Sequence, residues 1–278
     1  ILYLKRLFSK PFRAKRAGGQ TNRNYIVSFK KKKFFVRLPW ERVLDRKTEG
    51  KNILALSRNK KVQRIIPKYY IYVLSKKNIV NPRDKNRYNV PDGTMVMEYI
   101  SGSEFTMWHF RQKKYQRALA KIFYTFHTSG VRFVNPYDVF RDEVTKYRRE
   151  ANKHRLEKLV SKKIVRKLES IDKKTKRELK STKKGISTHN DFLFQNLIVS
   201  NEGRIYILDF EYAGFNQRGG ILYDIGYFFV DQLFRTPPMT KQLYDEFLRS
   251  VDRAYRQRLD RGQIYSATIA ALLVQVWW

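Results

Sequence analysis

Apolar and polar positions alternate in short blocks over the first hundred residues. Residues 25–29 and 34–38 are rich in β-branched and aromatic side chains, and four lysines, 30–33, separate them. Two such runs around a short polar segment predict a β-hairpin. Pro39 is expected to end its second strand, because proline cannot donate to a strand ladder.

One helix and two further strands are predicted in the same part of the chain. Asp45 to Leu56 has apolar residues available for burial near its end and an aspartate suited to capping its start, which predicts a helix. Residues 69–74 and 94–100 have the composition of strands. The first hundred residues therefore predict a small sheet with one helix.

Helical spacing dominates beyond residues 101–103, whose Ser-Gly-Ser interrupts the pattern and is our expected lobe boundary. Two sets of apolar residues each fall on one helical face: Tyr115, Leu119, Ile122, Phe123 and Phe126, and Leu243, Phe247, Val251, Tyr255 and Leu259. Residues 264–278 form a mostly apolar stretch of 15 residues. This is short of the roughly 20 residues of a membrane span, so we expect a buried C-terminal helix.

A second predicted hairpin interrupts these helices. The apolar runs 197–199 and 205–208 flank a glycine-bearing turn. Asp191 precedes this hairpin, Asn196 opens it and Asp209 closes it. Because a hairpin brings its two ends together, we expect these three side chains to converge.

Such a group suits phosphoryl transfer. One carboxylate can position and deprotonate an attacking hydroxyl, while an amide oxygen and a second carboxylate hold Mg²⁺ against the phosphates. A lone His-x-Asp is more typical of a capped turn. The full run His189-x-Asp191-x4-Asn196, followed by Asp209 after the second strand, is far more specific.

The same residues lie in a longer stretch that resembles the catalytic core of choline and ethanolamine kinases. This stretch is THNDFLFQNLIVSNEGRIYILDFEYAGFN, residues 188–216, followed by YDIGYFF, residues 223–229. Four other segments resemble the family's phosphate loop, nucleotide-binding strand, glutamate-bearing helix and a linker of bacterial choline kinases of the phosphorylcholine-decoration type: GGQTNRNY (18–25), FFVRLPW (34–40), DRKTEGKN (45–52) and FHTSGVRFVNPYDVF (126–140). The similarity spans roughly residues 18–260.

The resemblance implies a fold and a division of the chain. The fold is the α+β, two-lobed, protein-kinase-like fold of aminoglycoside phosphotransferases and choline kinases. We expect a basic N-terminal extension, 1–17, a nucleotide-binding N-lobe, 18–100, and a catalytic and acceptor-binding C-lobe, 101–278, with a basic helical segment, 141–186.

The resemblance also implies roles for individual residues. Asp191 matches the catalytic base, and Asn196 and Asp209 match the magnesium ligands. Arg37 matches the basic residue that contacts the ATP phosphates, and Glu49 its ion-pair partner. The remaining matches are Gly18, Gly19, Thr21 and Asn22 in the phosphate loop, Met97 and Tyr99 in the adenine hinge, Glu211 and Tyr212 for the acceptor, and His189 and Asp224 in and behind the catalytic loop. We expect His189 to orient the loop rather than act as a base, and His109, His127 and His154 to be structural or exposed.

The implied activity is an ATP- and magnesium-dependent kinase for the hydroxyl of a small polar alcohol. Choline is the leading acceptor, and ethanolamine or an amino sugar stays open. Choline kinases usually hold the ammonium with two tryptophans three residues apart in a late helix, where this chain has Thr268 and Ala271. Trp277 and Trp278 lie beyond, as displaced substitutes or, in our preferred interpretation, as core residues.

The charge of the chain has no explanation in this activity. The 278 residues carry a net charge of +34. Residues 1–17 hold six basic and no acidic residues and 141–186 hold 18 basic and seven acidic, whereas 187–232 hold two basic and six acidic. The basic segments could bind a polyanion, either RNA or an anionic membrane surface. The alternative function is a kinase-like fold that serves as a basic RNA-binding or ribosome-associated module with vestigial or secondary activity.

Composition bears only weakly on location. The chain has no cysteine, which excludes disulfides and fits a reducing compartment. No signal-peptide pattern is visible. We expect the cytoplasm or another reducing intracellular compartment, with an organelle left open.

Overall fold

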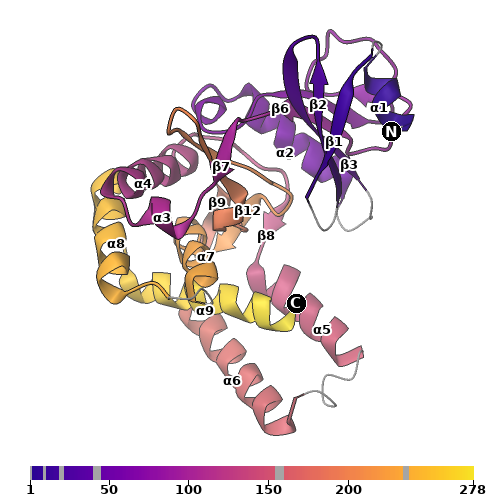
Figure 1. Ribbon diagram of the computed structural model, residues 1–278. Coiled ribbons are helices and arrows are strands. Elements are labelled where there is room, and N and C mark those ends of the chain that lie inside the picture. The colour runs from indigo at the N-terminus through magenta and orange to yellow at the C-terminus, as the bar shows by residue number, and fades with distance from the viewer. Residues whose placement is uncertain (1, 9–10, 19–21, 40–44, 154–159, 234–237) are drawn as a thin grey trace. The chain divides into compact units, whose positions relative to one another are not determined.

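The computed structural model describes residues 2–8, 11–18, 22–39, 45–153, 160–233 and 238–278 (Figure 1). The side chains of residues 182–184 and 231 lie outside this description. The chain forms two compact units. The first comprises Ile1–Glu104 and Leu197–Glu211, and the second Phe105–Asn196 and Tyr212–Trp278.

The first unit is built on a six-stranded antiparallel sheet (Figure 1). In sheet order its strands are β1 (Arg13–Ala17), β2 (Asn22–Phe29), β3 (Lys32–Pro39), β6 (Met95–Glu98), β4 (Tyr69–Leu74) and β5 (Lys77–Asn78). The predicted hairpin is confirmed as β2 and β3. Lys30 and Lys31 make its turn, both in the left-handed region, with φ of 48° and 62°.

Two helical elements accompany this sheet. α2 (Arg46–Arg58) is the predicted helix, and the Asp45 side chain caps it by accepting the Lys47 N–H at 3.0 Å. A short 3-10 turn, η1 (Val62–Arg64), follows. These confirmed elements place Arg37 on a central strand and Glu49 on the helix.

The N-terminal residues differ from the extension we predicted. They form α1 (Leu2–Leu7) and β1, which pairs with β2. Leu4 and Phe8 are buried with Val27 and Val36 in the core of the first unit. Strand pairing and this apolar packing hold the segment within the unit.

A second sheet of the first unit sets its observed boundary. Its strand order is β11 (Ile205–Ile207), β10 (Leu197–Ser200) and β7 (Gly102–Glu104), which confirms the predicted second hairpin. Because β7 pairs with β10, residues 102–104 and 197–211 belong to the first unit. The boundary between the units therefore falls at Glu104 rather than at residues 101–103. The first unit also includes the second hairpin.

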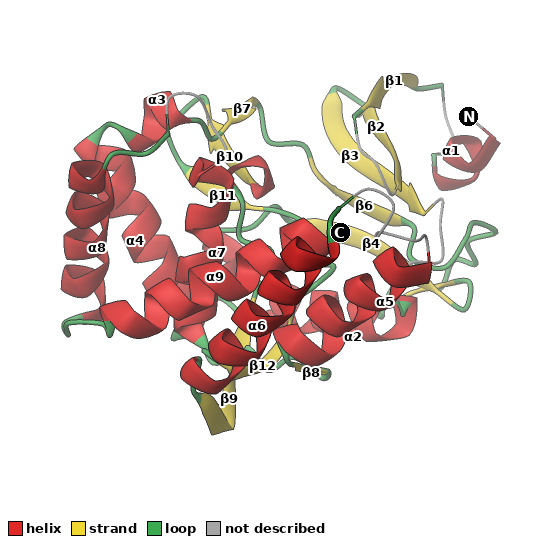
Figure 2. Ribbon diagram, turned by 90° about the horizontal axis from the view of Figure 1, so that it is seen from below, coloured by secondary structure: helices red, strands yellow, loops and turns green. Residues whose placement is uncertain are grey.

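The second unit is mainly helical (Figure 2). Its helices are α3 (Met107–Phe110), α4 (Lys113–His127), the π-helix η2 (Phe140–Val144), α5 (Thr145–Lys153), α6 (Lys162–Glu178), the 3-10 turn η4 (Phe194–Asn196), α7 (Ile221–Leu233), α8 (Lys241–Tyr255) and α9 (Arg261–Trp277). α4 packs on α8, and α9 packs on both α7 and α6. A small sheet joins β8 (Pro136–Tyr137), β12 (Gly214–Arg218) and β9 (Ser181–Thr188).

The predicted helical faces are buried as expected. All five apolar positions of α4 are buried, as are Phe247 and Val251 of α8, while Leu243 and Tyr255 are half-buried and Leu259 lies past the end of that helix. The predicted C-terminal helix is confirmed as α9, with nine buried residues. Among the described residues, no helix is long and apolar enough to span a membrane.

Candidate active site

A buried ion cluster lies on the sheet of the first unit. The Arg37 guanidinium, 5% exposed, donates to Glu49, and Arg46 donates to the other Glu49 oxygen at 3.0 Å. The Tyr72 hydroxyl donates to that same oxygen at 2.7 Å. Burial favours the neutral form of Glu49, but the two arginines outweigh it and lower its pKa. The Arg37–Glu49 pair expected from the resemblance is therefore formed.

Arg37 keeps donor capacity beyond this pair. Within the described ranges, its Nε is buried and has no hydrogen-bond partner. Burial lowers the pKa of Arg37, but the charges of Glu49 and Asp209 outweigh burial and raise it above its usual value. A buried, charged guanidinium with an unused donor suits a phosphate oxygen.

The predicted phosphate loop falls partly outside the described residues. Gly19 and Thr21 are among those not described. Gly18 follows β1 and its carbonyl accepts the side-chain amide of Asn24 at 2.8 Å. Asn22 begins β2, and its Oδ1 accepts Arg46 at 3.3 Å. The end of the loop at Asn22 is thus hydrogen-bonded to Arg46 of the ion cluster.

The predicted hinge follows a central strand. Met97 is buried in β6, in register with Phe35 of β3 and Tyr69 of β4. Tyr99 comes just after β6 and is half-buried, with the Lys33 ammonium 5.7 Å from its ring. The role of both residues at adenine stays a prediction.

In the second unit, hydrogen bonds fix the carboxylate of Asp191. Its Oδ2 accepts Asn196 Nδ2 at 2.8 Å, and the same nitrogen donates to the Asp191 carbonyl at 2.8 Å. The Asp191 backbone N–H donates to His189 Nδ1 at 3.3 Å. His189 is fully buried and Asp191 is half-buried. This bond agrees with the orienting role predicted for His189, which stays a prediction, as does the role of Asp191 as the base.

Buried polar groups hold this loop from below. Asp224 on α7 is fully buried and accepts the backbone N–H groups of His189 and Asn190 at 2.9 and 2.8 Å. It also accepts His127 Nε2 at 2.9 Å. Asn190 is in the left-handed region, with φ of 65°. These bonds agree with a supporting role for Asp224, and they agree with the structural role that we expected for His127.

Asn196 and Asp209 offer oxygen atoms that fit Mg²⁺. The hydrogen bonds of the Asn196 side chain given above use its Nδ2, which leaves its Oδ1 as the atom suited to a cation. Asp209 is exposed and in the left-handed region, with φ of 56°. Both supply the hard oxygen that Mg²⁺ prefers, and Mg²⁺ keeps several waters, so two protein ligands suffice. Asn196 lies in the second unit and Asp209 in the first, so their convergence stays a prediction.

Glu211 and Tyr212 end one unit and begin the other. Both are half-buried. The Tyr212 carbonyl accepts Asn190 Nδ2 at 3.0 Å, and its hydroxyl lies 3.3 Å from that of Tyr147 on α5. Tyr212 is thus tied to the catalytic loop through its backbone, with a second tyrosine beside its ring hydroxyl.

Comparison with known proteins shows the family of the chain. The chain matches the choline/ethanolamine kinase family over residues 15–251. It belongs to that family. A search among curated protein sequences finds no match.

Solved structures show the same fold at low sequence identity. The choline kinase LicA from Streptococcus pneumoniae is 21% identical, with a TM-score of 0.68, and the alignment covers 96% of this chain and 84% of LicA. A choline/ethanolamine kinase family protein from Mesorhizobium loti is 18% identical, with a TM-score of 0.66 and coverage of 100% and 83%. An ethanolamine kinase from Plasmodium vivax is 19% identical, with a TM-score of 0.67 and coverage of 96% and 75%.

Membership confirms the class of fold and reaction that the sequence predicted. The kinase has the α+β fold of choline kinases and aminoglycoside phosphotransferases and is a phosphotransferase that acts on an alcohol group. LicA has also been solved in complex with AMP, in keeping with nucleotide use in the family.

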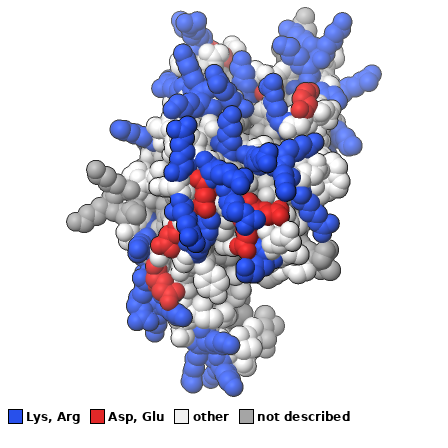
Figure 3. All heavy atoms as spheres, turned by 90° about the vertical axis from the view of Figure 1, so that its left-hand side faces the viewer, with Lys and Arg blue, Asp and Glu red and all other residues white. Residues whose placement is uncertain are grey.

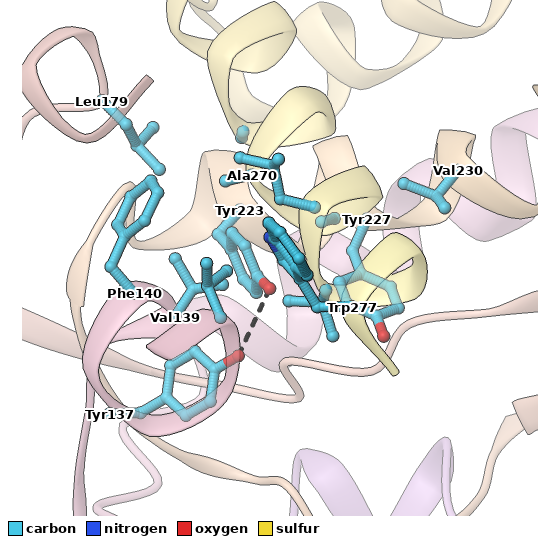
Figure 4. Close-up of a cluster of buried hydrophobic side chains, with 14 of the residues drawn as sticks. Tyr137, Val139, Phe140, Leu179, Tyr223, Tyr227, Val230, Ala270 and Trp277 are labelled. Atoms are coloured by element: carbon cyan, nitrogen blue, oxygen red, sulfur yellow. Dashed lines mark hydrogen bonds between the residues drawn. The ribbon is translucent and has the colours of Figure 1, made fainter. Parts of the chain in front are cut away.

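The sequence did not indicate a buried aromatic and acidic network in the second unit, whose Tyr137–Tyr223 hydrogen bond is drawn in Figure 4. Tyr137 donates to Glu143 and lies 3.2 Å, hydroxyl to hydroxyl, from Tyr223. Burial raises the pKa of Glu143 to about 8, and the charge of Asp191 acts in the same direction. The π-helix η2 contains this glutamate. The two hydrogen bonds of Tyr137 join it to residues six and 86 positions away in sequence, so no local pattern indicated the network.

The late helix of this kinase lacks the usual tryptophan pair, as the sequence indicated. Thr268 and Ala271 are buried on α9, and the Thr268 hydroxyl donates to the Ile264 carbonyl at 3.0 Å. Trp277 is 4% exposed and packs among Tyr223, Tyr227 and their neighbours (Figure 4). Our core interpretation holds for Trp277 and is wrong for Trp278, which is 72% exposed.

Proposed function

We propose that this kinase transfers the γ-phosphoryl group of ATP to the hydroxyl of choline with the help of Mg²⁺. The observation that carries the proposal is the half-buried Asp191, held by Asn196 within the part of the chain that matches the family. Mg²⁺, when bound, would neutralise charge on the phosphates. Asn196 and Asp209 are its proposed ligands.

The proposed reaction uses Asp191 as the base. The acceptor oxygen bonds to the γ-phosphorus, the bond from that phosphorus to the bridging oxygen breaks, and ADP leaves with the electron pair. The hydroxyl proton passes to the Asp191 carboxylate. On the nucleotide side, the unused Nε of Arg37 supports a phosphate contact, with Glu49 holding the guanidinium.

The test is turnover of ATP with Mg²⁺ against choline, ethanolamine and an amino sugar, with the phosphorylated product measured by mass spectrometry. We expect choline to be phosphorylated fastest. Asp191→Asn should lower turnover by about 10²–10⁴-fold, because it removes the base. Asp245→Asn on α8, where the carboxylate pairs with Lys241 at 3.0 Å, is the matched control. Turnover of Asp191→Asn near that of the control would contradict the proposal.

Acceptor recognition is proposed for Tyr212 and Glu211. A quaternary ammonium is attracted to an aromatic face and to a carboxylate. Tyr212→Ala should raise KM for choline by about 2- to 30-fold, the equivalent of ~0.5–2 kcal/mol, and change KM for ATP much less. Tyr265→Ala, at a 64% exposed position of α9, is the control. Equal effects on the two constants would remove Tyr212 from the acceptor site.

The polyanion partner stays a prediction for the basic segments. Figure 3 shows a face crowded with lysine and arginine side chains. α6 packs Val165, Leu168 and Ile171 against the core, while eight basic residues of α6 and its end are all exposed: Lys162, Lys163, Arg166, Lys167, Lys173, Lys176, Arg177 and Lys180. If they bind phosphates, affinity for RNA or for anionic vesicles should fall by roughly 10³–10⁵ between 50 and 200 mM salt, given six to ten contacts. Changing the eight to Gln should remove that binding. The contacts and comparisons give no support to the alternative of a basic RNA-binding or ribosome-associated module with vestigial or secondary activity.

A further inference from the structure

The start of the chain is basic throughout. Its first 39 residues contain 12 lysines and arginines and no aspartate or glutamate. The structure places them in α1, β1, β2 and β3 of the first unit. Arg37 is buried in the ion cluster, whereas the other basic residues that the structure describes in this segment are all exposed: Lys5, Arg6, Arg13, Lys15, Arg16, Arg23, Lys30, Lys31, Lys32 and Lys33. A segment with charge of only one sign creates a positive potential that attracts polyanions.

Four phenylalanine rings hold parts of this segment together. The Phe8 ring, just past α1, lies 5.6, 5.3 and 5.8 Å from the rings of Phe12, Phe29 and Phe34, measured between centroids. Phe12 directly precedes β1, and Phe29 and Phe34 flank the lysines of the β2–β3 turn. The end of α1, the start of β1 and this turn therefore meet at one corner of the sheet. We call this surface the basic corner; it comprises residues 2–8, 12–16 and 29–34.

α1 gives the basic corner an apolar tip. Leu2 and Tyr3 are 64% and 40% exposed. The Arg6 guanidinium lies 5.5 Å from the centre of the Tyr3 ring and donates to the Asn89 carbonyl at 2.7 Å, which ties the helix to the rest of the unit. A leucine and a tyrosine beside exposed cations suit the headgroup region of a membrane, where the apolar side chains leave water and the cations meet lipid phosphates. RNA offers the same phosphates but would leave the leucine in water.

We propose that the first unit docks on an anionic membrane surface through the basic corner, with Leu2 and Tyr3 entering the boundary between headgroups and acyl chains. The predicted phosphate loop lies at the other end of β2, which runs from Asn22 to Phe29. A strand of this length spans roughly 25 Å, so docking at the turn leaves the loop end of the strand uncovered. The surface is separate from α6, and the proposal does not depend on the reaction proposed for Asp191.

Co-sedimentation with lipid vesicles tests the proposal. The full chain is used with the eight basic residues of α6 and its end changed to Gln, so that α6 cannot supply the binding. It should bind vesicles of phosphatidylcholine and phosphatidylglycerol, mixed two to one, and not vesicles of phosphatidylcholine alone. Changing lysines 30–32 to Gln should weaken this binding about 100-fold, at about fivefold for each lysine. The control changes three exposed lysines of the same unit outside the basic corner, and it should weaken binding less than about fivefold: Lys60, Lys61 and Lys76, each to Gln.

A second variant distinguishes lipid from RNA. Leu2→Ser combined with Tyr3→Ala should weaken binding to the anionic vesicles about 10-fold, because two apolar side chains no longer leave water, and should change binding to a single-stranded RNA much less. Unchanged vesicle binding in this double variant, together with RNA binding that depends on lysines 30–32, would assign the basic corner to RNA and overturn the proposal. So would no binding to the anionic vesicles at low salt, or an equal loss in the lysine variant and its control. Kinase turnover with soluble substrates is measured separately, so none of these outcomes bears on the proposed reaction.

Discussion

Glu49 in the first unit and Glu143 in the second are about equally buried, at 4% and 5% exposure, but their pKa values are shifted in opposite directions. Glu49 lies between Arg37 and Arg46, and its pKa is lowered. Glu143 accepts a neutral hydroxyl from Tyr137, and burial raises its pKa to about 8. Burial penalises the charge in both, so the neighbouring cations decide which form is present at neutral pH. The first unit thus keeps a charged cluster suited to phosphates, while the second keeps a neutral acid near Asp191.

Among the variants that test this contrast, Glu49→Gln should have the largest effect on stability. It leaves the buried Arg37 guanidinium without its counter-charge, and we expect the free energy of unfolding to fall by about 3–5 kcal/mol. Urea unfolding at pH 7 measures it. Lys47→Gln, at an exposed position of the same helix, should change that free energy by less than about 0.5 kcal/mol. A loss as small as the control's would show that the ion cluster is not what holds α2 to the sheet.

Glu143→Gln should change the pH dependence of stability. With a folded pKa of about 8 against an ordinary 4.5, the wild type binds one more proton when folded between these values. Its free energy of unfolding should therefore fall with rising pH through this window, by about 1.4 kcal/mol per pH unit from this residue. The variant should lack that contribution. Glu49 has the opposite sign, since its stabilisation is present above pH 4.5 and is lost as the pH falls.

The outcome is read as the difference between wild type and Glu143→Gln in urea unfolding from pH 5 to 8. If the variant becomes more stable relative to the wild type as the pH rises, Glu143 is a neutral acid when buried. A constant difference would mean that Glu143 is ionised throughout, as Glu49 is.

Tyr137→Phe should have the smallest effect. It removes the hydroxyl that Glu143 accepts, which costs about 1 kcal/mol. That hydrogen bond also restrains the pKa of Glu143, so its loss should move the pH-dependent window to higher pH. The same pH series measures the shift. A window moved to lower pH would show that Tyr137 does not stabilise the carboxylate form.

Elements with regular apolar spacing were predictable from the sequence, and polar strands were not. β2, β3, β4, α2 and α4 follow a strand or helix period, and the structure confirms them. β1 was missed because four of its five residues are exposed, and β7 because all three of its residues are exposed. These strands are fixed by backbone pairing with a neighbour, which leaves no periodic signal in the side chains.

In the candidate active site too, only the residues that follow a local pattern could be predicted from the sequence. Asp191, Asn196 and Asp209 stand in one short stretch at a specific spacing, so their chemistry could be inferred. Gln275 on α9 donates to the Tyr227 hydroxyl on α7 at 3.0 Å, from 48 residues away in sequence. Their contacts depend on how α7 and α9 pack, which neither local spacing nor residue type contains.

The β2–β3 turn places two lysines where the backbone conformation favours other residues. Lys30 and Lys31 both occupy the left-handed region, where an L-residue loses about 1–2 kcal/mol and Asn-Gly is the usual choice. Ser75 and Lys76 repeat this pairing between β4 and β5. Lysine therefore occurs even where the backbone disfavours it. Replacing Lys30 and Lys31 with Asn-Gly is a route to a more thermostable enzyme, and it leaves every strand and every proposed active-site residue unchanged.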